Sequence, residues 1–185
     1  MSDMVLTRDV LTRDLPLAGR MHGGAGVSVE AAPAAYRVNL RADEAGAAAL
    51  SKALGVTLPT APKTSASKGS RHALWLGPDE WLVIDETADP AADCANVSTA
   101  HSAVDVSHRN TAILVNGRGA ADVLNAGCPQ DLSLEAFPVG ACSRTVFGKI
   151  EVVLYRTAED AFRVECWRSF SDYAFEFLKD AARGN

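Results

Sequence analysis

Apolar and polar side chains alternate over short stretches of the chain, and turn-forming residues separate these stretches. Residues 36–40 alternate as expected for a strand that buries one face. An acidic pair at 43–44 then begins an Ala-rich stretch that predicts a helix, which Gly55 can end. The Pro, Ser, Lys and Gly residues of 59–70 predict a loop or linker. Regular structure in the first half of the chain therefore begins with a strand and a helix.

Residues 71–86 hold two short apolar runs on either side of a Gly-Pro-Asp-Glu turn, which predicts a β-hairpin. Pro78 fixes the backbone φ angle that a tight turn needs. Trp75 and Trp81 lie one on each predicted strand, where large rings bury apolar area against their neighbours. We expect both rings to pack in a core or between lobes, not to stack on a ligand.

The second half of the chain repeats a related order of elements. The pattern predicts strands near 103–106, 111–116, 143–147, 150–156 and 161–167, with a helix near 119–125 and a last helix after them. Strands joined by hairpins, with helices between them, are typical of an α+β fold. We therefore predict antiparallel sheets covered on one face by helices, arranged as two ferredoxin-like βαβ lobes.

The last helix carries a stripe of apolar residues at helical spacing, which predicts that it closes the core. The stripe consists of Phe170, Tyr173, Ala174, Phe177, Leu178 and Ala181. Phe175 lies off this stripe, and Trp167 ends the preceding strand. Exposed aromatic residues are candidate anchors for a partner protein. The alternative is that the amino-terminal segment or the second lobe covers both side chains.

Residues 1–30 lack a long periodic pattern, so we interpret them as an amino-terminal arm. Such an arm either becomes ordered against a partner or is a frayed terminus. We expect residues 31–185 to form a single domain, with a division into two lobes at 31–100 and 101–185 as the alternative.

The composition and net charge of the chain disfavour some classes of binding partner. A chain of 185 residues with 48% hydrophobic content can bury a core, and a net charge of −5 disfavours nucleic acid and anionic membranes as partners. A secretion signal and an apolar stretch of membrane-spanning length are not recognisable, so we expect a cytoplasmic protein. The four cysteines form no Cys-x-x-Cys pair and are expected to be buried or to be free thiols.

Two residue sets could be drawn as binding sites, and the pattern disfavours both. The Gly-Arg-Gly-Ala-Ala-Asp segment at 117–122 lies where a dinucleotide fingerprint would, but Asp122 replaces its third glycine and would oppose a pyrophosphate. His101, Asp105 and His108 could suggest a metal site, but a strand would point His108 to the opposite face. We expect Asp105 to hold a corner by accepting backbone N–H groups, and Arg109 to form an ion pair locally or across an interface.

Cys128, next to Pro129, is the best candidate for a reactive thiol, but the sequence places no histidine to deprotonate it. We therefore assign no catalytic, cofactor-binding or metal-binding residue to this chain. The residues that we select as structural or interface candidates are Trp75, Trp81, Asp105, Arg109, Trp167 and Phe175.

Five segments, in order along the chain, resemble the gamma subunits of heterotetrameric sarcosine oxidases, which are related to the folate-binding aminomethyltransferase fold of the glycine-cleavage T-protein. The segments are Trp-Leu-Gly-Pro-Asp-Glu-Trp-Leu (75–82), Val-Asp-Val-Ser-His-Arg (104–109), Gly-Cys-Pro-Gln-Asp-Leu (127–132), Phe-Pro-Val-Gly-Ala-Cys (137–142) and Arg-Ser-Phe-Ser-Asp-Tyr (168–173). The resemblance implies that 31–185 is an aminomethyltransferase-like domain.

The same resemblance implies a function. The family's complex demethylates sarcosine oxidatively to glycine and offers the one-carbon unit to tetrahydrofolate. Its FAD, FMN, NAD and zinc are held by the large alpha and beta flavoprotein subunits and the small zinc-binding delta subunit. This chain would bind no cofactor itself and would contribute structure and assembly.

Two alternatives stay open. One is the equivalent subunit of a related N-methyl amino acid dehydrogenase, which these residues do not separate from a sarcosine oxidase. The other is a free-standing folate-binding protein that transfers one-carbon units. Aminomethyltransferases use an acidic residue in an amino-terminal segment together with a folate pocket, and neither motif is matched in this chain.

Overall fold

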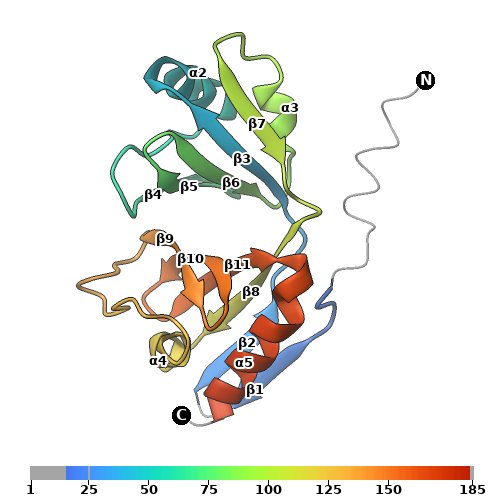
Figure 1. The fold of residues 1–185 in the computed structure, drawn as a ribbon, viewed down its shortest axis with the longest axis vertical. Coiled ribbons are helices and arrows are strands. Elements are labelled where there is room, and N and C mark those ends of the chain that lie inside the picture. Colours follow the sequence, from blue (N-terminus) through green and yellow to red (C-terminus); the bar gives the residue numbers. More distant parts are fainter. Residues whose placement is uncertain (1–15, 25, 184–185) are drawn as a thin grey trace. The chain divides into compact units, whose positions relative to one another are not determined.

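A computed structural model describes residues 16–24 and 26–183, which form two compact units (Figure 1). Residues 34–109 make the first unit. The second unit combines 16–33 with 110–183, so one of its segments precedes the first unit in the sequence and the other follows it. Each unit has its own antiparallel sheet and its own apolar core. The predicted α+β class is confirmed. The predicted boundary at 100/101 is wrong, because the strand that begins at His101 pairs within the first unit.

The first unit has a five-stranded sheet in the order β4-β5-β6-β3-β7. Its elements are β3 (Tyr36–Ala42), α2 (Glu44–Leu54), β4 (Ser65–Lys68), β5 (Arg71–Gly77), β6 (Glu80–Asp85), α3 (Pro90–Cys94) and β7 (His101–Asp105). Without the edge strand β4, this is the strand order of a ferredoxin-like βαββαβ motif. The strand β4 lies in the stretch for which the sequence predicted only a loop.

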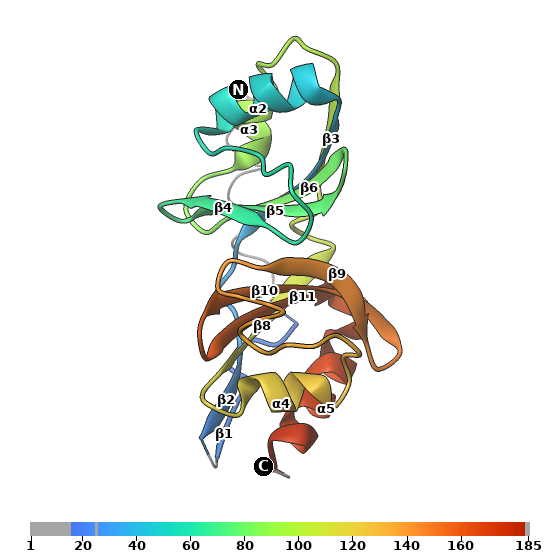
Figure 2. The same cartoon turned by 90° about the vertical axis from the view of Figure 1, so that its left-hand side faces the viewer.

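Local signals explain the elements of the first unit. The Asp43 side chain caps α2 by accepting the Gly46 N–H at 2.8 Å, and Gly55 ends the helix with a left-handed φ of 67°. Alternation along β3 buries Val38 and Leu40. Figure 2 shows α2 and α3 on one face of this sheet. The apolar side chains of both helices and of that face form one core, in which Trp81 is the largest member.

The second unit has a six-stranded sheet in the order β1-β2-β8-β11-β10-β9. Its elements are β1 (Met21–Gly24), β2 (Val27–Ala31), β8 (Asn110–Asn116), α4 (Ala120–Asn125), β9 (Cys142–Phe147), β10 (Ile150–Ala158), β11 (Ala161–Trp167), a 3₁₀ turn (Arg168–Phe170) and α5 (Ser171–Arg183). The order β2-β8-β11-β10 again matches the ferredoxin-like arrangement. Here, however, the strand beside β8 is β2, which comes from the amino-terminal side of the chain.

The expectation of a separate arm over 1–30 is therefore wrong for its described part, whereas 1–15 lie outside the described residues. The strand β2 pairs with β8, and Val27 and Val29 are buried in the core. Strands β8, β11 and β10 would otherwise leave the backbone groups of β8 unpaired at a sheet edge. The short strand was missed because only two of its side chains alternate into the core.

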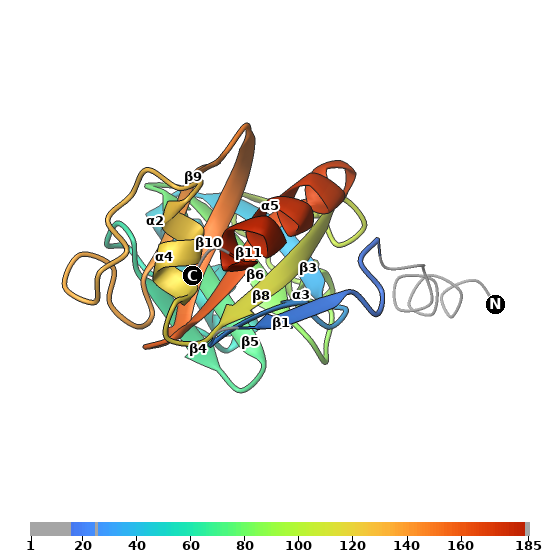
Figure 3. The ribbon, with the colours of Figure 1, turned by 90° about the horizontal axis from the view of Figure 1, so that it is seen from below.

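The helix α5 crosses the sheet of the second unit, with α4 beside it (Figure 3). Phe175 is only 2% exposed, so the expectation that it projects towards a partner is wrong. The Arg20 guanidinium lies 4.4 Å from the centre of the Phe175 ring, and the alternative that the amino-terminal segment covers this side chain is confirmed. Phe170 and Tyr173, which were assigned to the buried stripe, are 41% and 40% exposed. No helix within 16–24 and 26–183 is long and apolar enough to cross a membrane.

Candidate functional site

The tryptophan hairpin of the first unit is held at its turn by polar contacts. Trp75 and Trp81 are directly opposite each other in the β5–β6 register, so their side chains lie on the same face of the sheet. Trp81 is 2% exposed and its indole N–H donates to the Pro59 carbonyl oxygen at 2.7 Å, whereas Trp75 is only half-buried. In the turn, Asp79 accepts a hydrogen bond of 2.6 Å from Arg41. The hairpin motif therefore serves packing and turn formation.

A buried ionic network ties the two ends of that hairpin to both helices of the first unit. Arg71 donates to Asp85 at 2.9 Å, to Asp93 at 2.7 Å and to the Leu54 carbonyl oxygen at 2.7 Å. Burial alone would raise the pKa of Asp85, but hydrogen bonds from the Thr87 N–H, the Ser70 hydroxyl, the Arg71 guanidinium and the Ala88 N–H hold that pKa well below its usual range. These contacts join β5, β6, α2 and α3.

Sequence reasoning missed this network, although a signal was available. Arg71 and Asp85 stand near the two ends of the predicted hairpin, and its register places them directly opposite each other. Opposite charges at one cross-strand pair favour contact. The carboxylate of Asp93, on a short helix after Pro90, gave no comparable signal.

The corner after β7 is built as the sequence predicted for its aspartate. The Asp105 carboxylate accepts the Ser107 N–H at 2.8 Å, and the Ser107 hydroxyl accepts the Arg37 N–H at 2.8 Å. Asp105 and Arg109 are both exposed, and the expected ion pair of Arg109 stays a prediction. The His101 ring nitrogen Nδ1 lies 2.7 Å from the Thr99 carbonyl oxygen. In the part of the chain that is described, no three His, Cys, Asp or Glu side chains are grouped as metal ligands.

The Gly-Cys-Pro-Gln-Asp-Leu corner of the second unit is a packing motif. A Cβ at Gly127 would lie 2.7 Å from ring atoms of both Phe147 and Phe177, so only glycine fits between these rings. The Gly127 carbonyl oxygen accepts the Gly148 N–H at 2.8 Å. Cys128 is 4% exposed and lies in the core, which supports the structural interpretation of this cysteine over a reactive thiol. The other three cysteines are also buried.

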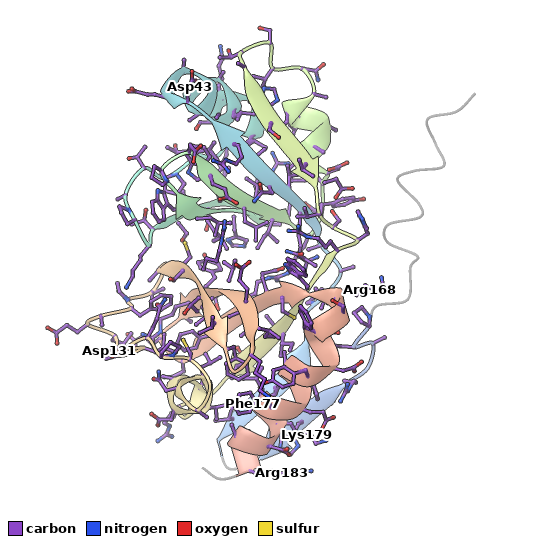
Figure 4. All side chains as sticks on the ribbon, in the orientation of Figure 1. Asp43, Asp131, Arg168, Phe177, Lys179 and Arg183 are labelled. Carbon is purple, nitrogen blue, oxygen red and sulfur yellow. The ribbon has the colours of Figure 1, made fainter. Side chains whose placement is uncertain are left out.

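Asp131, labelled in Figure 4, ends the same corner. Its carboxylate accepts the Ser133 N–H at 2.8 Å, and this backbone hydrogen bond lowers the pKa of Asp131. The neighbouring Leu132 is fully buried. The Asp131 hydrogen bond and the buried Leu132 side chain therefore both stabilise the loop after α4.

The segment at 137–142 is fastened to the sheet by Arg156. This side chain is 3% exposed, donates to the Phe137 carbonyl oxygen at 2.5 Å and lies 4.4 Å from the centre of the Phe162 ring. Burial lowers the pKa of Arg156. The backbone of Arg156 also pairs with Gly140 and Ala141. This motif holds a long loop against the second unit.

The glycine-rich segment after β8 has a steric explanation. Gly117 has a φ of 119°, and a Cβ there would lie 1.9 Å from the Gly26 carbonyl oxygen. Gly117 is therefore required where the β1–β2 turn approaches the start of α4. The helix α4 spans only Ala120–Asn125, with Asp122 in its first turn. This geometry agrees with the predicted strand-to-helix turn.

Three surface features remain as candidate sites. In the first unit, a pocket of about 430 Å³ lies between α2, the β5–β6 turn and Trp81. Its carboxylates at Asp43 and Asp79 are engaged by the Gly46 N–H and by Arg41. In the second unit, Trp167 is 42% exposed and stacks on Phe170 with 5.9 Å between ring centres.

A groove of about 510 Å³ runs along the outer face of α5 in the second unit. It is lined by two aromatic and three acidic side chains: Asp172, Tyr173, Glu176, Phe177 and Asp180. Sequence reasoning assigned Tyr173 and Phe177 to the core and so missed this face of the helix.

Comparison with known proteins agrees with this geometry. The model of the sarcosine oxidase, gamma subunit family matches residues 39–184. A sarcosine oxidase subunit gamma from Corynebacterium sp. (strain U-96) is 35% identical over 140 residues, which is 74% of this chain and 68% of the relative. One from Arthrobacter sp. is 34% identical over 154 residues, which is 80% of this chain and 75% of the relative.

Solved structures give the same result. A chain of heterotetrameric sarcosine oxidase from Corynebacterium sp. U-96, in complex with pyrrole 2-carboxylate, matches with a TM-score of 0.85 and 30% identity over 93% of this chain and 95% of that one. The glycine-cleavage aminomethyltransferase T from Bartonella henselae matches with a TM-score of 0.62 and 15% identity, over 94% of this chain and 52% of that one. The second match supports the aminomethyltransferase-like fold. The first, together with the family match, shows that this chain belongs to the sarcosine oxidase gamma subunit family.

Proposed function

We propose that this chain is the gamma subunit of a heterotetrameric sarcosine oxidase and that its role in the complex is structural. The family match over 39–184 carries the proposal. The TM-score of 0.85 to a chain of the Corynebacterium complex supports it, because nearly the whole of both chains is covered.

The placement of the family's segments supports a structural role. Trp81 fills the core of the first unit, Asp105 holds the corner after β7, and Gly127 admits two aromatic rings. Arg156 fastens the loop that contains Phe137. Four of the five segments that gave the resemblance thus contribute a turn, a core side chain or a loop attachment in their own units, whereas the fifth, at 168–173, exposes Phe170 and Tyr173.

In this proposal the complex oxidises the N-methyl group of sarcosine, reduces oxygen to peroxide, releases glycine and transfers the one-carbon unit to tetrahydrofolate. The redox cofactors FAD, FMN and NAD, and the zinc, belong to the alpha, beta and delta subunits. This chain supplies surfaces on which those subunits assemble. Trp75, Asp105, Arg109 and Trp167 are at least partly accessible in their own units and are candidates for such surfaces.

The test compares the full chain alone with the full chain co-expressed with the other subunits. We expect the purified chain to lack flavin absorbance and to produce no peroxide from sarcosine. A tag on this chain should recover a complex that contains flavin and oxidises sarcosine. Sarcosine should be compared with other N-methyl amino acids, because the related dehydrogenase subunits are an alternative.

Two results would contradict the proposal. Peroxide production from sarcosine by the chain alone would make it catalytic. Failure to recover any flavoprotein, combined with saturable binding of a reduced folate to the lone chain, would favour a free-standing folate-binding protein.

A further inference from the structure

The apolar surface of α5 is wider than the core that the helix covers. Ala174, Phe175 and Leu178 are buried in the second unit. Tyr173 is 40% exposed, and its ring centre lies 6.1 Å from that of the partly buried Phe177. At about 100° per residue, Tyr173 and Phe175 lie about 200° apart around the helix. The segment around Arg20 covers the Phe175 side of this arc, whereas the Tyr173 side forms a wall of the groove.

The groove also has a row of carboxylates. Asp172, Glu176 and Asp180 recur at every fourth residue and therefore lie along one side of the helix. Their side chains are 77%, 46% and 66% exposed. Figure 4 labels Phe177, Lys179 and Arg183 on this helix. Aromatic rings and acidic oxygens thus line the same groove.

This acidic row does not serve the helix. Like charges four residues apart destabilise a helix. Asp180, in the last turn, also faces the negative end of the helix dipole. Arg20 pairs with Asp172 and with Glu176, Lys179 pairs with Glu176, and Arg183 pairs with Asp180. The pair of Arg183 with Asp180 is exposed on both sides, so it is weak and can be replaced by a partner's cation, whereas Arg20 and Lys179 are only 31% and 25% exposed.

We propose that this groove docks a segment of another subunit of the complex, one that inserts an apolar side chain beside Tyr173 and Phe177 and sets lysine or arginine residues along the carboxylate row. The proposal rests on the proposed function. An apolar side chain would bury the open part of both rings. Cations would complement the three carboxylates and would contact the ring faces. An anionic occupant, such as a folate, would be repelled by the same row.

The experiment uses the full chain co-expressed with the other subunits, with Asp180→Lys as the test variant. Asp180 pairs with the solvent-exposed Arg183, and lysine suits the last turn of a helix, so the fold should be kept. Glu159→Lys is the matched control, because it makes the same charge change at an exposed turn of the same unit. We expect Asp180→Lys to weaken assembly about tenfold and to flatten its salt dependence. Tyr173→Ser should weaken assembly independently of salt, and thermal unfolding checks that each variant is folded.

The outcomes are distinguishable. If the wild-type chain does not co-purify with a flavoprotein, the proposed function fails. If the wild type assembles and both Asp180→Lys and Tyr173→Ser assemble equally well at low and high salt, the groove proposal is overturned and the proposed function stands. Equal weakening by Glu159→Lys would also overturn it, because net charge would then explain the effect. Self-association that Asp180→Lys abolishes while assembly is retained would assign the groove to a second copy of this chain.

Discussion

The two units share one strand order but obtain their strands differently. In the first unit, the order β5-β6-β3-β7 comes from a continuous stretch between Tyr36 and Asp105. In the second, the order β10-β11-β8-β2 needs a strand from the amino-terminal side of the chain. The difference shows that a ferredoxin-like sheet is defined by which strands pair with each other, and that the same pairing can be reached with a different order of strands along the chain.

The units also differ in what holds their elements together. In the first, the buried Arg71 joins the hairpin to α2 and α3 through Asp85, Asp93 and the Leu54 carbonyl oxygen. In the second, the buried ion pair of Arg163 with Glu165 lies within β11, and aromatic contacts join different elements: Phe147 lies 4.7 Å from Phe177 between ring centres. Ionic contacts depend on pH, whereas aromatic packing does not. The comparison therefore predicts different responses of the two units to mutation and to acid.

The largest effect should follow removal of β2. A chain that begins at residue 32 would lose the pairing of β2 with β8 and the buried side chains of Leu17, Val27 and Val29, each worth about 1.5 to 3 kcal/mol. We expect the second unit to lose its protection from hydrogen exchange while the first unit keeps its own. Met21→Ser, at a side chain that is 76% exposed, is the control and should change little. Retained protection of β8 in the truncated chain would show that β2 is dispensable.

A second large effect should separate the two tryptophans of the hairpin. Trp81→Ala removes a fully buried ring and should lower the free energy of unfolding by about 3 to 5 kcal/mol. Trp75→Ala should cost clearly less, because that side chain is only half-buried. Trp167→Ala, in the second unit, is the exposed control. Equal losses at Trp75 and Trp81 in chemical unfolding would contradict the assignment of the core to Trp81.

Much of the fold was predictable from alternation and turn chemistry. The strand of 36–40, the helix between Asp43 and Gly55, the hairpin around Pro78 and the three strands after Cys142 are all present. These elements carry local signals: period-two burial, a cap, or a turn residue. The ferredoxin-like order followed from their succession, since strand and helix alternate in the expected way.

The parts that failed depend on contacts distant in sequence. The residues of β2 carry no local sequence signal that predicts pairing with β8. The apolar residues of α5 cover a broad arc, and their pattern does not predict which part of the arc packs against the core. Phe175 was placed outside and Tyr173 inside because the periodic pattern fits either side of the helix. Arg20, which is distant in sequence, packs on the Phe175 ring and so helps to bury that side of the helix. The groove was missed for the same reason.

An effect of intermediate size should follow loss of the Arg71–Asp85 ion pair in the first unit. Asp85→Asn leaves Arg71 with a weaker partner and should cost about 2 to 3 kcal/mol at neutral pH. Because the pKa of Asp85 is lower in the folded state than the ordinary value of about 3.9, its contribution is present above that value and is lost as the pH falls below it.

The measurement is the free energy of unfolding as a function of pH. The wild type should lose stability steeply below about pH 4, and Asp85→Asn should lose less over the same range. Asp131→Asn is the comparison in the second unit: the pKa of Asp131 is also lowered, but its carboxylate is exposed, so this variant should change the acid profile less than Asp85→Asn does. Identical acid profiles for the wild type and Asp85→Asn would remove Asp85 as the source of the acid sensitivity.

The smallest effect should distinguish α2, which follows β3 in the first unit, from α4, which follows β8 in the second. The eleven-residue α2 is capped by the Asp43 carboxylate, whereas the six-residue α4 begins at Gly119 without a side-chain cap. Asp43→Ala should therefore cost about 1 kcal/mol, because it leaves the Gly46 N–H without its acceptor. Gly119→Ser should stabilise by a few tenths of a kcal/mol, since serine can supply the missing acceptor and glycine is only slightly worse at this position. Chemical unfolding of both variants beside the wild type measures the two changes. A gain at Gly119 as large as the loss at Asp43 would mean that α4 contributes as much to its unit as α2 does, despite its shorter length and missing cap.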